Sequence, residues 1–359
     1  MSETATIAEM ANKVSQELFQ WFKWERVPLM DQDFKCVKSD KHAPTKKTEH
    51  THPVDVVLHY VDPYINKRVL LNTDLKSYAN ASIQTKQVRD ALKSLAKTID
   101  CARVSQEWKS RYSLFQEPYE IRGLLFVYNH DGEFDKSFLK FFDEKKPKGG
   151  TQDDEAEDKS VSTERLPLEG NQLIHIVEPR LISYMSTILA DVHRLHAEGT
   201  FPVKDYFFHY PDLKLHKTSG AKATRPATIE MIAGPFLTIE HSVVKKYDET
   251  SGDVEETYPA GYVIYYNRPG RSHLEFMYLF DTLSNYQILD GSHPIRIRVA
   301  HYSPANDVRS NFEKAINSYV QDWGFDDYKK NRLKQITIDI VEITKTTFSK
   351  QDIGWDRKK

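Results

Sequence analysis

The chain has 359 residues, enough for one large or two ordinary domains, and its 39% hydrophobic and 12% aromatic residues suffice for a core. Its 50 Lys and Arg against 52 Asp and Glu give a net charge of −2, which argues against a strongly basic nucleic-acid-binding domain but leaves room for a local basic patch. No apolar stretch is long enough to span a bilayer and the first ten residues lack a secretory pattern, so we expect a cytoplasmic protein with no membrane partner.

The N-terminal residues 5–25 place apolar side chains three and four positions apart, which predicts an amphipathic helix that carries Glu17. A weak strand is predicted at residues 33–37. Residues 38–52 are polar and basic and are expected to form a loop.

The cysteines and the nearby histidines do not indicate a zinc site. Two cysteines, Cys36 and Cys101, are too few for a disulfide framework or a multi-cysteine zinc site, so we expect them to be reduced and buried. His50 and His52 have the spacing of a zinc pair, but no third or fourth ligand is evident nearby in the sequence.

A hairpin follows the loop. Residues 54–61 and 68–78 are rich in β-branched and aromatic side chains, and the residues between them include Asp, Pro and Asn, which favour a turn. If the turn is centred between Tyr64 and Ile65, the numbers of cross-strand partners sum to 129.

In this register two acidic residues oppose each other. Asp55 faces Asp74 with Cβ atoms about 5 Å apart, and Lys76 lies on the same face as Asp74. Two carboxylates at that separation suit a hard cation such as Mg²⁺, and an ammonium beside them can orient water or offset developing charge. The alternative is an exposed sheet face on which Lys76 only neutralises the acids.

A helix and a strand complete the first domain. Residues 83–99 carry an apolar stripe at helical spacing, and Lys86 in the first turns is either a phosphate contact or an ordinary exposed lysine. Residues 121–130 form a nearly continuous apolar run, which predicts a strand buried on both faces. Residues 144–170 combine Lys, Gly, Pro and acids, which predicts a linker or loop between a domain at 1–143 and another at 171–359.

The second domain is predicted to begin with a strand at 173–177 and a helix that opens at Pro179. Residues 205–225 mix aromatic and basic side chains, as in surfaces that stack bases and hold phosphates; a strand followed by a basic loop is the alternative. The candidate nucleic-acid contacts there are Lys214, Lys217, Lys222 and Arg225. From residue 228 the patterns follow the order β-β-α-β-α-β, which predicts an α+β domain for nucleic-acid binding or assembly.

The first domain resembles the PD-(D/E)xK phosphodiesterase superfamily, which includes restriction endonucleases, resolvases and DNA exonucleases. Pro53-Val54-Asp55 stands where that superfamily has its first acid, and Asp74-Leu75-Lys76 stands where it has (D/E)xK. The predicted elements follow the superfamily order α-β-β-β-α-β. Another such triplet, Asp212-Leu213-Lys214, lacks the preceding strand with its own acid and the following helix that favour Asp74.

The resemblance implies an α/β restriction-endonuclease-like core with a C-terminal α+β domain. It implies a metal-dependent DNA endonuclease or exonuclease, as in restriction and anti-phage defence, with Asp55, Asp74 and Lys76 as catalytic residues. Mg²⁺ or Mn²⁺ would be held by both acids, the Leu75 carbonyl and an acid on the first helix, for which we choose Glu17. The alternative is a non-catalytic nuclease-like subunit that binds nucleic acid or scaffolds a complex, and in either case we expect a homo-oligomer or a partner subunit.

Overall fold

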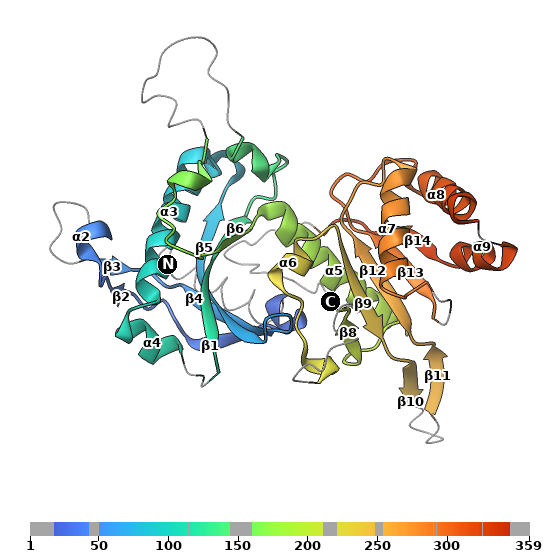
Figure 1. The fold of residues 1–359 in the computed structure, drawn as a ribbon, viewed down its shortest axis with the longest axis horizontal. Coiled ribbons are helices and arrows are strands. Elements are labelled where there is room, and N and C mark those ends of the chain that lie inside the picture. Colours follow the sequence, from blue (N-terminus) through green and yellow to red (C-terminus); the bar gives the residue numbers. More distant parts are fainter. Residues whose placement is uncertain are drawn as a thin grey trace, which may run out of the picture. The chain divides into compact units, whose positions relative to one another are not determined.

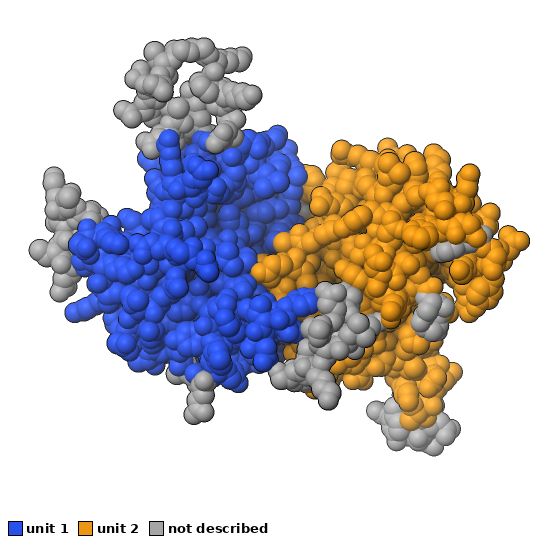
Figure 2. Space-filling view, in the orientation of Figure 1, with its two compact units in different colours: residues 1–182, 345–359 blue, residues 183–344 orange. Residues whose placement is uncertain are grey.

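A computed structural model describes the following parts of the chain (Figure 1): residues 18–42, 50–113, 115, 117–143, 160–210, 221–247, 254–289, 291, 293–324 and 326–344. The chain forms two compact units, the first ending at Ile182 and the second spanning Ser183–Thr344 (Figure 2). Among the described helices, none is both long enough and apolar enough to cross a membrane.

A five-stranded mixed sheet is the centre of the first unit, with the strand order β1-β4-β5-β6-β7. Strand β4 runs antiparallel to both of its neighbours, β1 and β5. Strands β5, β6 and β7 run parallel to one another. The bounds of these strands are β1 (Glu25–Met30), β4 (Val56–Asp62), β5 (Lys67–Tyr78), β6 (Tyr119–Asn129) and β7 (Ile174–Val177).

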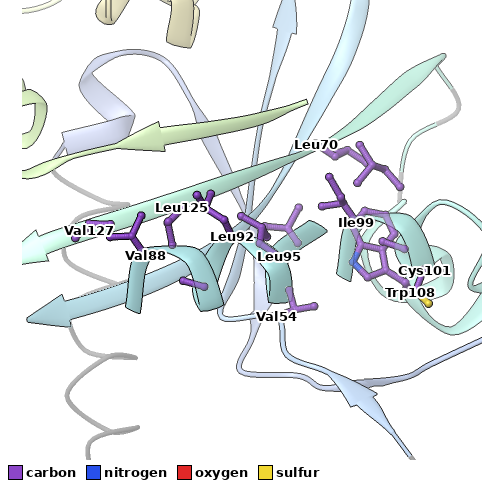
Figure 3. Packing of buried hydrophobic residues seen from close by; sticks show 14 of the residues in the cluster. Val54, Leu70, Val88, Leu92, Leu95, Ile99, Cys101, Trp108, Leu125 and Val127 are labelled. Atoms are coloured by element: carbon purple, nitrogen blue, oxygen red, sulfur yellow. The ribbon is translucent and has the colours of Figure 1, made fainter. Parts of the chain in front are cut away.

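One face of this sheet is covered by helices α3 (Thr85–Ala102) and α4 (Gln106–Tyr112), as Figure 3 shows. Alternation along the strands places Leu70 and Leu125 on this face, where they form one cluster with the apolar stripe of α3. The other face is also buried, since Phe126 contacts the ring of Phe19. The sheet is therefore covered on both sides, which explains the long apolar strands.

Smaller elements flank the sheet. Strands β2 (Phe34–Lys35) and β3 (Thr51–His52) form a separate two-stranded sheet, and helix α2 (Ser39–His42) follows β2. The short 3₁₀ helices of the chain are η2 (Asn80–Ser82), η3 (Phe138–Phe141), η5 (Thr163–Arg165) and η7 (Lys222–Thr224).

The predicted hairpin register is confirmed, because the ladder of β4 and β5 runs from Val56 opposite Thr73 to Asp62 opposite Lys67. The first strand was predicted wrongly. The strand that joins the main sheet is β1, and only Phe34 and Lys35 of the predicted strand 33–37 are extended, in the smaller sheet. Of the predicted helix 5–25, residues 18–21 are helical, and Lys23 adopts a φ of 63° before β1 begins.

Strand β7 belongs to the sheet of the first unit. It pairs in parallel with β6 and so completes the first sheet. The sequence analysis assigned residues from 171 onward to the C-terminal domain, whereas the first compact unit extends to Ile182. Helix α5 (Pro179–Ala197) opens at Pro179 as predicted, and most of its length belongs to the second unit.

The second unit has its own mixed sheet, with the strand order β14-β13-β12-β9-β8. Strands β12, β13 and β14 are parallel, and β9 pairs antiparallel with both β12 and β8. The strands are β8 (Tyr206–Phe208), β9 (Phe236–His241), β12 (Gly261–Tyr266), β13 (Ile295–Val299) and β14 (Thr337–Ile340), with a separate hairpin of β10 (Val244–Tyr247) and β11 (Val254–Tyr258).

Helices cover both faces of this second sheet. Helices α7 (His273–Asn285) and α8 (Val308–Trp323) share one apolar cluster with Ile264 and Ile297. On the other face α5 donates a hydrogen bond from the Tyr184 hydroxyl to the Tyr265 carbonyl. Two shorter helices are α6 (Ile229–Ile232) and α9 (Asp327–Lys334). The predicted arrangement, an α/β core with a further C-terminal domain, is confirmed.

Candidate active site

The two predicted acids lie at the end of the hairpin that is far from its turn. Val56 opposite Thr73 is the last pair of the ladder, so Asp55 directly precedes β4 and Asp74 is the next residue on β5. Leu70 on β5 faces α3, and alternation along that strand places Asp74 and Lys76 on the same face of the sheet. Asp55 lies close to both, because its carboxylate accepts the Leu75 N–H and is influenced by the charges of Asp74 and Lys76.

Two short contacts hold these side chains in place. The Leu75 backbone N–H donates to Asp55 Oδ2 at 2.6 Å, and Lys76 Nζ lies 2.7 Å from Asp74 Oδ1. Asp74 is buried, whereas the Lys76 side chain retains 32% of its exposure. The cluster is therefore partly open to solvent.

The negative charges of the two carboxylates are not fully balanced by the positive charge of Lys76. Burial, followed by the negative charge of Asp74, raises the pKa of Asp55 to about 7, against the opposing influence of the Leu75 N–H and of Lys76. Burial alone would lower the pKa of the Lys76 ammonium, but the charge of Asp74 and its hydrogen bond outweigh it and the pKa is raised. Lys76 thus stays charged, and the site has room for a second positive charge.

The donor set fits a hard divalent cation. Each acid offers carboxylate oxygens, which are the ligands that Mg²⁺ prefers. A strand residue directs its N–H and C=O to the same neighbour, so the Leu75 carbonyl points to the edge where β4 has ended and Asp55 lies. That carbonyl is thus suited to be a third oxygen ligand.

Sequence reasoning missed Asp31, which directly follows β1. Its backbone N–H donates to the Asp55 carbonyl at 3.0 Å, and its charge adds to the forces that raise the pKa of Asp55. An acid at the end of a strand could have indicated this position. The sequence analysis missed it because it predicted the strand at residues 33–37, whereas β1 ends at Met30.

The remaining predicted residues are less well placed. Lys86 is exposed in the first turn of α3. Glu17, Lys214 and Lys217 lie outside the described residues. Lys222 is described and pairs with Glu240 at 2.5 Å, so its charge is already compensated.

A cavity of about 660 Å³ lies in the second unit. Its lining includes Tyr328, Lys329 and Arg332 from α9, together with His293. No carboxylate is found among the described residues that line it, so this cavity differs in charge from the hairpin site.

The two cysteines are free, as predicted, but they are not far from other metal-binding side chains. Cys36 and Cys101 lie together with His42 and His52, and the ligand atoms of all four are within 4.8 Å of one another. The sequence analysis set a zinc site aside because it found two cysteines too few and no further ligand near His50 and His52, whereas the fold brings Cys36 and Cys101 together across 65 residues.

The mixed sheet, the helix α3 and the paired acids before a lysine define a nuclease domain of the PD-(D/E)XK class. The family model described as "GAPS4 protein PD-(D/E)XK nuclease domain" matches residues 1–180, half of the chain, and the protein belongs to this family. GAPS4 itself is a component of an anti-phage defence system. No curated protein and no solved structure matches the chain.

Proposed function

We propose that the protein is a divalent-cation-dependent deoxyribonuclease, an endonuclease or exonuclease that hydrolyses phosphodiester bonds of DNA in the cytoplasm. The observation that carries the proposal is the pair of Asp55 and Asp74 with one lysine, in which the pKa of one acid is raised to about 7. Acids with strongly perturbed pKa values gather at functional sites. Membership of the GAPS4 family supports a role in anti-phage defence.

The cation that we propose is Mg²⁺ or Mn²⁺, held by Asp55, Asp74 and the Leu75 carbonyl. When bound, it would lower the pKa of a bound water and stabilise charge on the leaving oxygen. Glu17 remains our proposal for a further ligand, and Asp31 is a described alternative close to Asp55.

The residues of the chain position the other reactants. The Leu75 N–H fixes one oxygen of Asp55, so the carboxylate has a defined orientation. Lys76 keeps its proton because of Asp74, and its ammonium can donate to the attacking water or to a phosphate oxygen that gains charge. Substrate contacts are proposed at Lys86 and, in the second unit, at Lys214 and Lys217.

Cleavage assays with the full chain test this proposal. We expect wild-type protein with Mg²⁺ or Mn²⁺ to cleave at least one DNA among linear, circular, nicked and branched forms, and Lys76→Ala to lose that cleavage. Asp327→Asn is a matched control, because Asp327-Tyr328-Lys329 is also an Asp-x-Lys triplet but lies on the exposed helix α9. Equal cleavage by wild type and Lys76→Ala would contradict the proposed site.

The alternative is a nuclease-like subunit that binds nucleic acid or a protein partner without catalysis. The second unit favours it, since it has a separate sheet, a separate core and a cavity lined by Lys329 and Arg332. Absence of cleavage on every substrate, combined with DNA binding or with stable assembly in light scattering, would support this alternative.

A further inference from the structure

Four metal-binding side chains converge in the first unit, outside the carboxylate site. Cys36 follows β2, His42 ends α2, His52 ends β3 and Cys101 lies near the end of α3. Each residue contributes one ligand atom, and these atoms all lie within 4.8 Å of one another.

The distances suit one tetrahedral ion. Cys36 Sγ is 3.6 Å from Cys101 Sγ and 3.7 Å from His42 Nδ1, and Cys101 Sγ is 3.2 Å from His42 Nδ1. Zinc bonds of about 2.3 Å to sulfur and 2.0 Å to nitrogen give tetrahedral edges of about 3.3–3.8 Å between ligand atoms. The two sulfurs are too far apart for a disulfide, in which they are about 2.05 Å apart.

A buried nitrogen in this group has no hydrogen-bond partner. The His52 side chain is 2% exposed, and its Nε2 is fully buried without an acceptor or donor. Leaving such a polar atom unpaired costs about 1–3 kcal/mol. A metal ion bound to Nε2 would remove this cost.

The surroundings of the group are those of a metal site. Asp100 lies 3.2 Å from His42 Nε2, on the side of the ring opposite the nitrogen that faces the sulfurs. Lys38 and Gln172 hold Asp100 in turn. Carboxylates commonly orient metal-bound histidines in this way.

We propose that Cys36, His42, His52 and Cys101 bind one Zn²⁺ ion as a structural site. Two thiolates and two imidazoles are a zinc donor set, and four protein ligands leave no position for a substrate. This inference goes beyond the nuclease activity and does not depend on it.

The proposed ion would join segments that are distant in the sequence. It connects the β2–α2 segment and β3 to the end of α3, and His52 is three residues before Asp55. The site would thereby fix the segment that leads into the first catalytic acid. A cavity of about 270 Å³ lined by His42, His50 and His52 gives an ion access to the group.

Metal analysis of the purified full chain tests the proposal. We expect about one zinc per chain after purification without chelators, and tetrahedral cobalt–thiolate absorption when Co²⁺ replaces the zinc. Asp55→Asn/Asp74→Asn should keep its zinc, which would separate this site from the carboxylate site.

Substitutions of single residues test which side chains bind the zinc ion. Cys101→Ser and His52→Ala should each lower the zinc content at least fivefold, whereas His50→Ala should leave it unchanged, because His50 is a neighbouring histidine outside the group. Wild-type measurements do not depend on whether a variant folds. Wild-type protein that contains no zinc and gives no cobalt–thiolate band, or a Cys36–Cys101 disulfide in mass spectrometry of protein prepared under reducing conditions, would overturn the proposal.

Discussion

Two buried carboxylates, one in each unit, have pKa values that are shifted in opposite directions. Asp191 on α5 is fully buried, and Arg298 donates to both of its oxygens at 2.6 and 2.9 Å. Burial alone would raise the pKa of Asp191, but hydrogen bonds from Arg298 and Arg194 lower it. At the hairpin, burial and Asp74 raise the pKa of Asp55 to about 7.

The difference shows how a structural charge is distinguished from a functional one. A buried acid that serves the fold is given its full set of donors, as Tyr265 and two arginines do for Asp191. Asp55 has a single backbone N–H as its described hydrogen-bond donor. An acid held in this unfavourable state is suited to a ligand that supplies the missing positive charge.

The largest effect is expected at Asp74. The substitution Asp74→Asn removes one of the two charges that we propose to hold the cation, so DNA cleavage should fall by about a thousand-fold or more, measured as an initial rate with Mg²⁺. The far-UV spectrum and the midpoint of unfolding should change little, because an amide has nearly the same volume. Retained activity in this variant would show that Asp74 is not required for DNA cleavage.

The corresponding change in the second unit should affect stability. Asp191→Asn removes the buried carboxylate of the Arg298 guanidinium and leaves it only the half-exposed Asp339, which should destabilise this unit by about 3–5 kcal/mol in denaturant titrations. The control is Glu198→Gln directly after the same helix, where an exposed pair with Arg194 contributes less than about 1 kcal/mol. Equal losses for the two variants would show that burial of the pair is not what matters.

Asp55→Asn should stabilise the metal-free protein at high pH. The folded pKa of about 7 lies above the unfolded value of 3.8, so the native state binds more protons between these values and wild-type stability falls as pH rises through that window. The variant lacks this loss, and at pH 8 it should be more stable than wild type by about 4 kcal/mol.

Below about pH 3 the two proteins should be equally stable, since Asp55 is then protonated in both states of the wild type. Urea titrations with a chelator present at pH 3 and pH 8 measure both values. A variant less stable than wild type at pH 8 would show that Asp55 is a structural acid like Asp191.

The smallest effect is the pH dependence of cation affinity. A proton competes with the cation for Asp55, so the Mg²⁺ dissociation constant should rise about tenfold for each pH unit below 7 and level off above it. Calorimetric titrations from pH 5.5 to 8.5 measure this slope. A dissociation constant independent of pH would exclude Asp55 as a ligand.

The sequence predicted the hairpin because its signals are local. The turn residues indicate where the hairpin is centred, and the ladder that follows ends with Val56 opposite Thr73, one residue short of Asp55 and Asp74. It missed β1, an edge strand that contains Pro28 and pairs irregularly with β4, so its periodicity is weak.

Non-local features could not be predicted in the same way. Cys36 and Cys101 meet only because α3 packs beside the small β2–β3 sheet, and no spacing in the sequence announces it. The segment 144–170 has the composition of a linker, yet the strand that follows it, β7, returns to the first sheet. Composition reports local solvation, whereas domain membership depends on strand pairing.

The most direct test of the central claim is anomalous diffraction from crystals of the full chain grown at pH 8 with Mn²⁺. The account predicts a manganese peak within bonding distance of oxygens of both Asp55 and Asp74, and no such peak in Asp74→Asn crystals. A site between these carboxylates that stays empty at saturating Mn²⁺, or an unchanged peak in the variant, would contradict it.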